Sequence, residues 1–229
     1  MRKKIAVIVS ILVVIAIMVV GLISLVDDKE DTTNTDALKF KEEYESINGK
    51  YDELTNLTAP SVTINKNNPI KYLSDSDILD KLTKDTNIIY MGYPEDGFSR
   101  RILPVLFDFA NKNKIKTIYY YNFYNLQQDY EKNEDQEKIA LYENIINVLG
   151  DTVTETYTEG IHSGIKKLSA PSIYFIKDGQ VVGSHHNAVE SYTNFNIDLT
   201  SEEAKELFNI YQDNYNKMFA NVCQEETLC

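Results

Sequence analysis

Few side chains in this 229-residue sequence are suited to chemistry, and Asp96 and Ser99 are the first candidates. With a histidine they would supply the acid, base and nucleophile of a hydrolase triad. Ser99 has no Gly-x-Ser-x-Gly sequence around it, which is the turn that exposes a hydrolase serine. Both residues are good helix N-caps, because their side-chain oxygens accept backbone N–H bonds. We therefore expect Asp96 or Ser99 to begin a helix rather than to catalyse hydrolysis.

The three histidines do not indicate a metal site. His185 and His186 are adjacent, and neighbouring residues of a strand point to opposite faces, so Glu190 cannot complete a site with both. His162 stands alone between Gly160 and Gly164. We expect neither a metal nor a cofactor.

The two cysteines, Cys223 and Cys229, lie close together at the end of the chain. An even pair in an oxidising compartment is typical of a structural disulfide, here one that closes only a short loop. Glu225 and Glu226 disfavour a reactive thiolate between them. We predict a Cys223–Cys229 disulfide, and a thiol–disulfide enzyme that works through this pair is the alternative.

The compartment follows from the N-terminal sequence, where residues 5–26 carry no charge. At about 1.5 Å per residue, such a run is long enough to cross a bilayer as a helix. Basic residues precede it and acidic residues follow it, so the positive-inside rule places residues 1–4 in the cytoplasm. We predict an uncleaved single-pass anchor at 5–26 in a bacterial cell membrane, a tether at 27–36 and an extracytoplasmic domain at 37–229. A cleaved secretory signal is the alternative.

The chain is acidic, with a net charge of −12. This charge disfavours nucleic acids and anionic lipid surfaces as partners. The sequence after the anchor is long enough for one domain with a sizeable core.

A strand, a tight turn and a helix are predicted around the candidate residues. An apolar run at 87–92 ends at Gly92 and Pro94 and is followed by apolar residues at helical spacing, namely Ile102, Val105, Leu106 and Phe109. Pro104 falls inside this helix, where it should produce a kink.

Elsewhere the patterns predict a helix at about 37–51 that is broken near Asn48-Gly49, further helices at 74–84, 137–149 and 201–219, and strands at 62–64 and 115–123. Ser201 is the expected cap of the last helix, and residues 127–135 are expected to form a polar surface loop. Lys177-Asp178-Gly179 between two apolar runs predicts a β-hairpin. The tyrosines at 119–121 suit a half-buried strand better than a stacking surface for sugars or bases.

The strand, turn and kinked helix resemble the active-site segment of thioredoxin-like proteins. In that family a strand runs into Cys-x-x-Cys at a helix start, and a proline follows five residues after the second cysteine. Here Pro104 lies five residues after Ser99, and Asp96-Gly97-Phe98-Ser99 occupies the Cys-x-x-Cys position. Both thiols of the family are therefore missing.

A second match lies near the predicted hairpin. Pro171 and Gly179 have the spacing of the family's cis-proline and hairpin glycine. Asn187 stands where the family usually has glycine, and asparagine tolerates a positive φ. The resemblance covers about 88–219, with an insertion of about 45 residues before Pro171.

The resemblance implies an α/β protein of the thioredoxin-like fold, a central mixed sheet flanked by helices, with an N-terminal extension and a single transmembrane helix. The stretch 40–82 is similar to the leader of secreted, membrane-anchored members, some of which are bacteriocin-transport accessory proteins of Gram-positive bacteria.

The family's dithiol chemistry needs a thiolate at the helix N-terminus and a second thiol one turn later. A carboxylate at Asp96 cannot attack a disulfide, and the Ser99 hydroxyl is a poor replacement for a thiol. The resemblance therefore implies a redox-inactive protein that binds a polypeptide or partner protein as a secretion or folding accessory. Its expected peptide groove consists of Tyr93, Pro94, Gly97, Phe98, Arg100, Ala170 and Pro171. A structural subunit of an export complex is a further alternative.

Overall fold

The computed structural model of the chain describes residues 35–53 and 56–220. The predicted anchor at 5–26, nearly all of the tether at 27–36 and both Cys223 and Cys229 lie outside these residues. Within the described ranges, no helix is long and apolar enough to cross a membrane.

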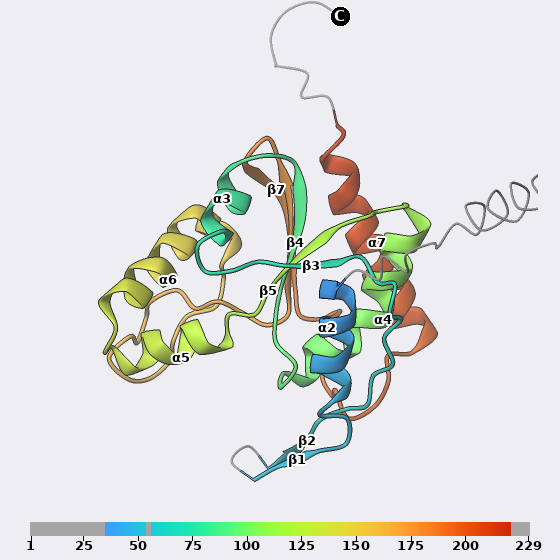
Figure 1. Cartoon of the computed structure of the whole chain (residues 1–229), viewed down its shortest axis with the longest axis horizontal. Coiled ribbons are helices and arrows are strands. Elements are labelled where there is room, and N and C mark those ends of the chain that lie inside the picture. Colours follow the sequence, from blue (N-terminus) through green and yellow to red (C-terminus); the bar gives the residue numbers. More distant parts are fainter. Residues whose placement is uncertain (1–34, 54–55, 221–229) are drawn as a thin grey trace, which may run out of the picture. The chain divides into compact units, whose positions relative to one another are not determined.

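Helices and strands alternate along the described chain (Figure 1). The helices are α2 (Thr35–Glu45), α3 (Ile78–Thr83), α4 (Gly97–Lys112), α5 (Tyr124–Lys132), α6 (Gln136–Leu149), the short 3₁₀ helix η1 (Gly150–Thr152) and α7 (Ser201–Lys217). The strands are β1 (Tyr51–Asp52), β2 (Leu57–Thr58), β3 (Ile70–Tyr72), β4 (Asn87–Met91), β5 (Ile118–Tyr121), β6 (Ser172–Lys177) and β7 (Gln180–His186).

Five strands form one mixed sheet in the order β3-β5-β4-β6-β7. The strands β3, β5 and β4 are parallel, whereas β6 is antiparallel to β4 and β7 is antiparallel to β6. Figure 1 shows α2, α4 and α7 on one side of this sheet and α3, α5 and α6 on the other. The strands β1 and β2 form a separate antiparallel hairpin.

Alternation of side chains along the central strands divides the core in two. On β4, Ile88 and Tyr90 pack in the cluster that includes α2, α4 and α7, and Ile89 and Met91 pack in the cluster with α3, α5 and α6. This follows from the period of two in a strand, since both faces of the sheet are covered. The tyrosines of β5 take part in this core, as predicted, and Tyr120 and Tyr121 are buried.

Several predicted elements are confirmed. The strand at 87–91, the helix after Asp96 and the helix that ends at Gly150 are all present. The hairpin turn has Asp178 and Gly179 at positive φ, and a Cβ on Gly179 would lie 2.1 Å from the Thr83 carbonyl oxygen. The Ala170–Pro171 peptide bond is cis, and Asn187 has a φ of 59°.

The surface loop predicted at 127–135 is wrong, because α5 covers most of it. Only Leu126, Gln127 and Tyr130 of this polar segment are buried, which is too few for a clear helical pattern. The Tyr130 ring stacks on the Tyr142 ring of α6 with centroids 4.1 Å apart. Tertiary packing therefore stabilises a helix that the local sequence does not indicate.

The strand predicted at 62–64 is also wrong, although the segment is extended and Val62 and Ile64 are buried. Their backbone N–H groups donate to the side chains of Asn48 and Glu45, at 2.9 and 2.7 Å, instead of to a neighbouring strand. The strand that joins the sheet is β3, whose three residues gave no separate signal.

The ends of other elements differ by a few residues. The helix α2 stops at Glu45, a few residues before the break predicted near Asn48-Gly49, and α3 begins at Ile78 instead of Ser74. The last helix is capped by Thr200 in place of Ser201, because Thr200 and Glu203 form a capping box.

One side chain joins the N-terminal extension to the rest of the fold. Arg100 of α4 is 1 % exposed. Its guanidinium donates to the carbonyl oxygens of Pro60, of Tyr44 at 2.8 Å and of Pro94 at 3.2 Å, and to the side chain of Asn48. Burial lowers the pKa of Arg100. Within the described residues no carboxylate pairs with this cation.

We predict that Arg100→Met lowers the free energy of unfolding by about 2–4 kcal/mol, because buried carbonyl groups lose their donors. The matched control is Lys112→Met on the same helix, since Lys112 pairs with Asp108 at an exposed position and its loss should cost no more than about 1 kcal/mol. Urea unfolding followed by circular dichroism measures both, and equal losses would contradict this role of Arg100.

Candidate functional site

The turn between β4 and α4 holds Asp96 and Ser99 as a helix cap. The Asp96 carboxylate accepts a hydrogen bond from the backbone N–H of Ser99, so Asp96 is the N-cap. Burial raises the pKa of Asp96 to about 6, and the nearby Glu155 carboxylate adds to the rise. Hydrogen bonds that Asp96 accepts from the start of the helix lower this pKa, but by less than burial raises it. The turn therefore holds a partly desolvated carboxylate whose charge is unfavourable there.

Ser99 faces the interior of the domain and is 0 % exposed. A Cβ built on Gly92 would lie 2.8 Å from both the Ser99 Oγ and the Tyr90 hydroxyl, so these groups crowd the same space beneath the turn. The Ser99 Oγ has no hydrogen-bond partner among the described residues. A serine enclosed in this way cannot reach a substrate, which argues against the hydrolase triad.

The second sequence match lies beside this turn. Met91, the last residue of β4, pairs with Ser172, the first residue of β6. The cis-proline Pro171 therefore lies next to the turn that follows β4, as it does in the family resembled. Together with the strand order, this placement decides the architecture. The fold is thioredoxin-like.

In this thioredoxin-like domain, two predicted groove residues are covered by the segment before α7. The Phe98 ring packs edge-on against Tyr192 and Phe195, with centroids 5.9 and 5.4 Å away. Phe195 also covers Gly97, where a Cβ would lie 2.4 Å from its ring. Phe98 and Gly97 are thus occupied by the chain's own side chains.

The remaining groove residues are also engaged internally. The Tyr93 ring packs against Phe123 and Tyr124, while Pro94 and Pro171 are buried and Ala170 is partly buried. Arg100 does not lie at the rim of a groove, because its guanidinium is enclosed by the N-terminal extension. The structure brings these residues to one end of the sheet without leaving them free to line a common open groove.

The histidines also have partners in the fold. His185 Nε2 lies 2.8 Å from the Ala188 carbonyl oxygen, and His186 Nδ1 lies 2.7 Å from the Ser172 Oγ. His162 stacks on Tyr130 with ring centroids 4.1 Å apart. Ser172 is buried and its Oγ donates to the Ser169 carbonyl, so the Ser172–His186 pair is not an accessible nucleophile.

Sequence reasoning missed Phe195, which packs on Phe98 and covers Gly97, and Glu155, whose carboxylate makes a smaller contribution to the raised pKa of Asp96. Phe195 stands among polar residues in Thr193-Asn194-Phe195-Asn196, without any periodic pattern. Glu155 belongs to the segment after η1, inside the predicted insertion, and acts on the charge of Asp96. Neither residue has a local signal, because both reach the turn only through tertiary structure.

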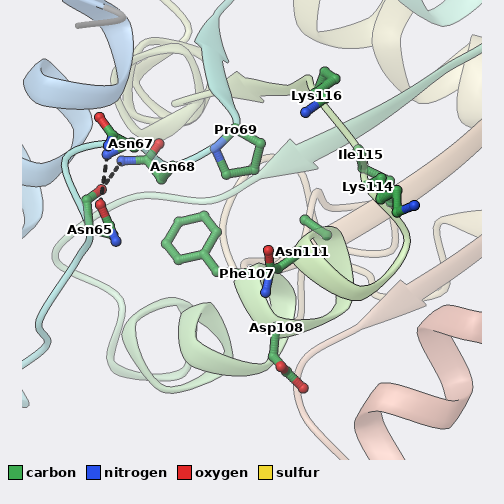
Figure 2. A pocket seen from close by; sticks show the side chains of 11 residues that line it. Asn65, Asn67, Asn68, Pro69, Phe107, Asp108, Asn111, Lys114, Ile115 and Lys116 are labelled. Atoms are coloured by element: carbon green, nitrogen blue, oxygen red, sulfur yellow. Dashed lines mark hydrogen bonds between the residues drawn. The ribbon is translucent and has the colours of Figure 1, made fainter.

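A polar cavity of about 530 Å³ lies away from the turn, beside the end of α4. Figure 2 shows that its walls carry mainly amide and ammonium groups, on Asn65, Asn67, Asn68, Asn111, Lys114 and Lys116, with the Phe107 ring between them. Cations are favoured where a helix ends, so Lys114 and Lys116 suit this position without a ligand.

Comparison with known proteins adds little to this geometry. No protein-family profile matches the chain, and no curated protein matches it. The crystal structure of thioredoxin O2 from Arabidopsis thaliana in the oxidized state is similar with 15 % sequence identity and a TM-score of 0.36. The alignment covers 65 % of this chain and 96 % of that chain.

The raised pKa of Asp96 predicts that stability falls as the pH rises through the range from about 4 to 6, because the folded state there binds more protons than the unfolded state. Asp96→Asn keeps a good cap and removes the buried charge. We expect it to be more stable than the parent above pH 6, by on the order of 2 kcal/mol, with the advantage disappearing near pH 4.

Thermal unfolding between pH 4 and pH 8 measures this difference. Asp135→Asn, the same change at the exposed cap of α6, is the matched control for loss of a charged cap. A constant difference between Asp96→Asn and the parent across this range would contradict the prediction.

Proposed function

We propose that this chain is a membrane-anchored, extracytoplasmic thioredoxin-like protein that lacks the catalytic dithiol. It binds a polypeptide or a partner protein as a secretion or folding accessory, in the manner of the bacteriocin-transport accessory proteins that its N-terminal stretch resembles. The observation that carries the proposal is the turn itself, where a helix-capping carboxylate stands at Asp96 and an enclosed hydroxyl at Ser99.

The chemistry of these two groups supports the loss of redox activity. Disulfide exchange begins with attack by a thiolate, which a helix N-terminus stabilises. A carboxylate at the same place accepts the helix N–H groups but forms no bond to sulfur. The anchor and the compartment are supported by the apolar run at 5–26 and by the charges on its two sides.

Strand β6, the cis-proline and the helix start keep their places around the turn, but Phe195 covers Gly97 and packs on Phe98. The binding role is therefore supported by the charge of the chain and not by an open groove. The acidic surface of the chain, with a net charge of −12, favours a basic or neutral polypeptide over an acidic one.

The test is an insulin-disulfide reduction assay on the full chain, purified in a non-ionic detergent. We predict that the parent is inactive and that the double variant Asp96→Cys/Ser99→Cys is active, because the helix N-terminus would stabilise a thiolate at position 96. Activity of the parent that disappears in Cys223→Ser would overturn the proposal in favour of an enzyme working through Cys223 and Cys229.

Binding is tested separately with a reduced, carboxamidomethylated basic protein that cannot fold. We expect its fluorescence anisotropy to rise on titration with the parent, and an acidic unfolded protein to bind more weakly. If neither polypeptide binds, the accessory role is wrong even though the loss of redox chemistry stands.

A further inference from the structure

The polar cavity of about 530 Å³ beside the end of α4 takes no part in the turn. Its volume falls in the range of about 300–1,000 Å³ that is typical of small-molecule pockets. We call it the asparagine cavity, after the four asparagines in its walls, Asn65, Asn67, Asn68 and Asn111 (Figure 2).

One wall is the segment 65–68, whose shape is fixed by its own hydrogen bonds. Asn68 is buried, and its Nδ2 donates to the carbonyl oxygens of Asn65 and Ala37, at 2.8 and 2.9 Å. The Asn65 Oδ1 in turn accepts the backbone N–H of Asn67 at 2.9 Å. This wall is preorganised, so a ligand does not have to order it on binding.

Two of the amides remain available to a ligand. The side chains of Asn67 and Asn111 are exposed, and neither makes a hydrogen bond within the described residues. A carboxamide both donates and accepts, so each of them can bind a hydroxyl group in either direction. Figure 2 shows the Phe107 ring between these two asparagines, so the amides stand on opposite sides of an apolar surface.

The Phe107 ring is held in place by the core beneath it. It is partly buried and packs edge-on against Phe40, with ring centroids 6.1 Å apart. The face of an aromatic ring is electron-rich and attracts the positive edges of C–H bonds. A flat apolar face with amides on both sides therefore fits the C–H face of a sugar ring, whose hydroxyl groups project from its edge.

The charges around the cavity favour an anion. Lys114 and Lys116 are exposed and form no ion pair within the described residues. Of the described residues that line the cavity, Asp108 alone carries a carboxylate. It pairs with Lys112 at 3.0 Å, and Figure 2 shows it directed away from the Phe107 ring. The end of α4 favours these cations by itself, but it does not explain the amides beside them.

We propose that the asparagine cavity binds a sugar ring that carries one anionic group, a carboxylate or a phosphate. The ring stacks on Phe107, its hydroxyl groups bind the amides of Asn67 and Asn111, and its anionic group lies near the ammonium group of Lys116. This inference goes beyond the proposed function, because the ligand is an anionic carbohydrate and not a basic polypeptide.

The experiment follows the isotopically labelled isoleucine methyl groups of the full chain by NMR, in a non-ionic detergent without a sugar headgroup. Ile115 lines the cavity, and Ile161, which is 71 % exposed in the segment after η1, gives the control signal. The probes are glucuronic acid and glucose-6-phosphate, and the comparison compounds are glucose, inorganic phosphate and a Gly-Ser peptide with one Glu. We expect both probes to shift the Ile115 signal saturably and every comparison compound to bind at least about fivefold more weakly.

A short oligomer of glucuronic acid distinguishes two sources of the same chemistry. Binding at least as tight as that of the monomer supports a site for one unit of a polysaccharide. Weaker binding of the oligomer supports a site for a free sugar.

Two variants locate the site. Lys116→Gln removes the cation, and we expect it to weaken glucuronic acid about fivefold. Its matched control is Lys132→Gln, the same change at an exposed lysine in the last turn of α5, which should bind as the parent does. Asn67→Asp keeps the shape of the side chain but brings a like charge to the ligand, so it should weaken binding at least about fivefold. Asn144→Asp, at an exposed position of α6, is the matched control for this charge.

The inference is overturned if neither probe shifts the Ile115 signal, or if a comparison compound binds as tightly as the probes. It is also overturned if Lys116→Gln or Asn67→Asp binds glucuronic acid as the parent does. Failure of this site leaves the proposed function untouched, because the insulin and basic-polypeptide assays contain no sugar. Failure of those assays likewise does not alter the Ile115 titration.

Discussion

The buried guanidinium of Arg100 is the interaction on which the arrangement around the turn depends. A cation removed from water needs every one of its donors satisfied, and here the acceptors are backbone carbonyls and an amide instead of a carboxylate. Those acceptors belong to α2, to the segment before the hairpin, to the segment after it and to the turn. One side chain of α4 therefore joins the extension to the start of its own helix.

The chemical character of the turn follows from the same enclosure. A solvated carboxylate at a helix N-terminus would be stabilised by the helix dipole, and its pKa would fall. At Asp96 burial outweighs this effect, so the pKa rises to about 6 although the carboxylate accepts a backbone N–H. Phe195 lies over Gly97, and the Glu155 carboxylate adds a smaller unfavourable contribution to the charge of Asp96. The turn is therefore built as a helix cap whose carboxylate is largely removed from water.

The sequence predicted the parts of the fold that have strong local signals. The run at 87–91, a cap at Asp96 or Ser99 and the turn at Asp178-Gly179 each depend on residues close together in the chain, and the structure has all three, with Asp96 as the cap. By contrast, α5 and β3 are stabilised by partners far away, as Tyr130 is by Tyr142, and a local pattern cannot report such contacts. The site was predictable to the same extent. Its capping residues were recognised from the sequence. The partners of its other residues were not, because Phe98 packs against the distant Phe195. Arg100 likewise donates to the carbonyl oxygens of Pro60 and Tyr44, which lie 40 and 56 positions before it.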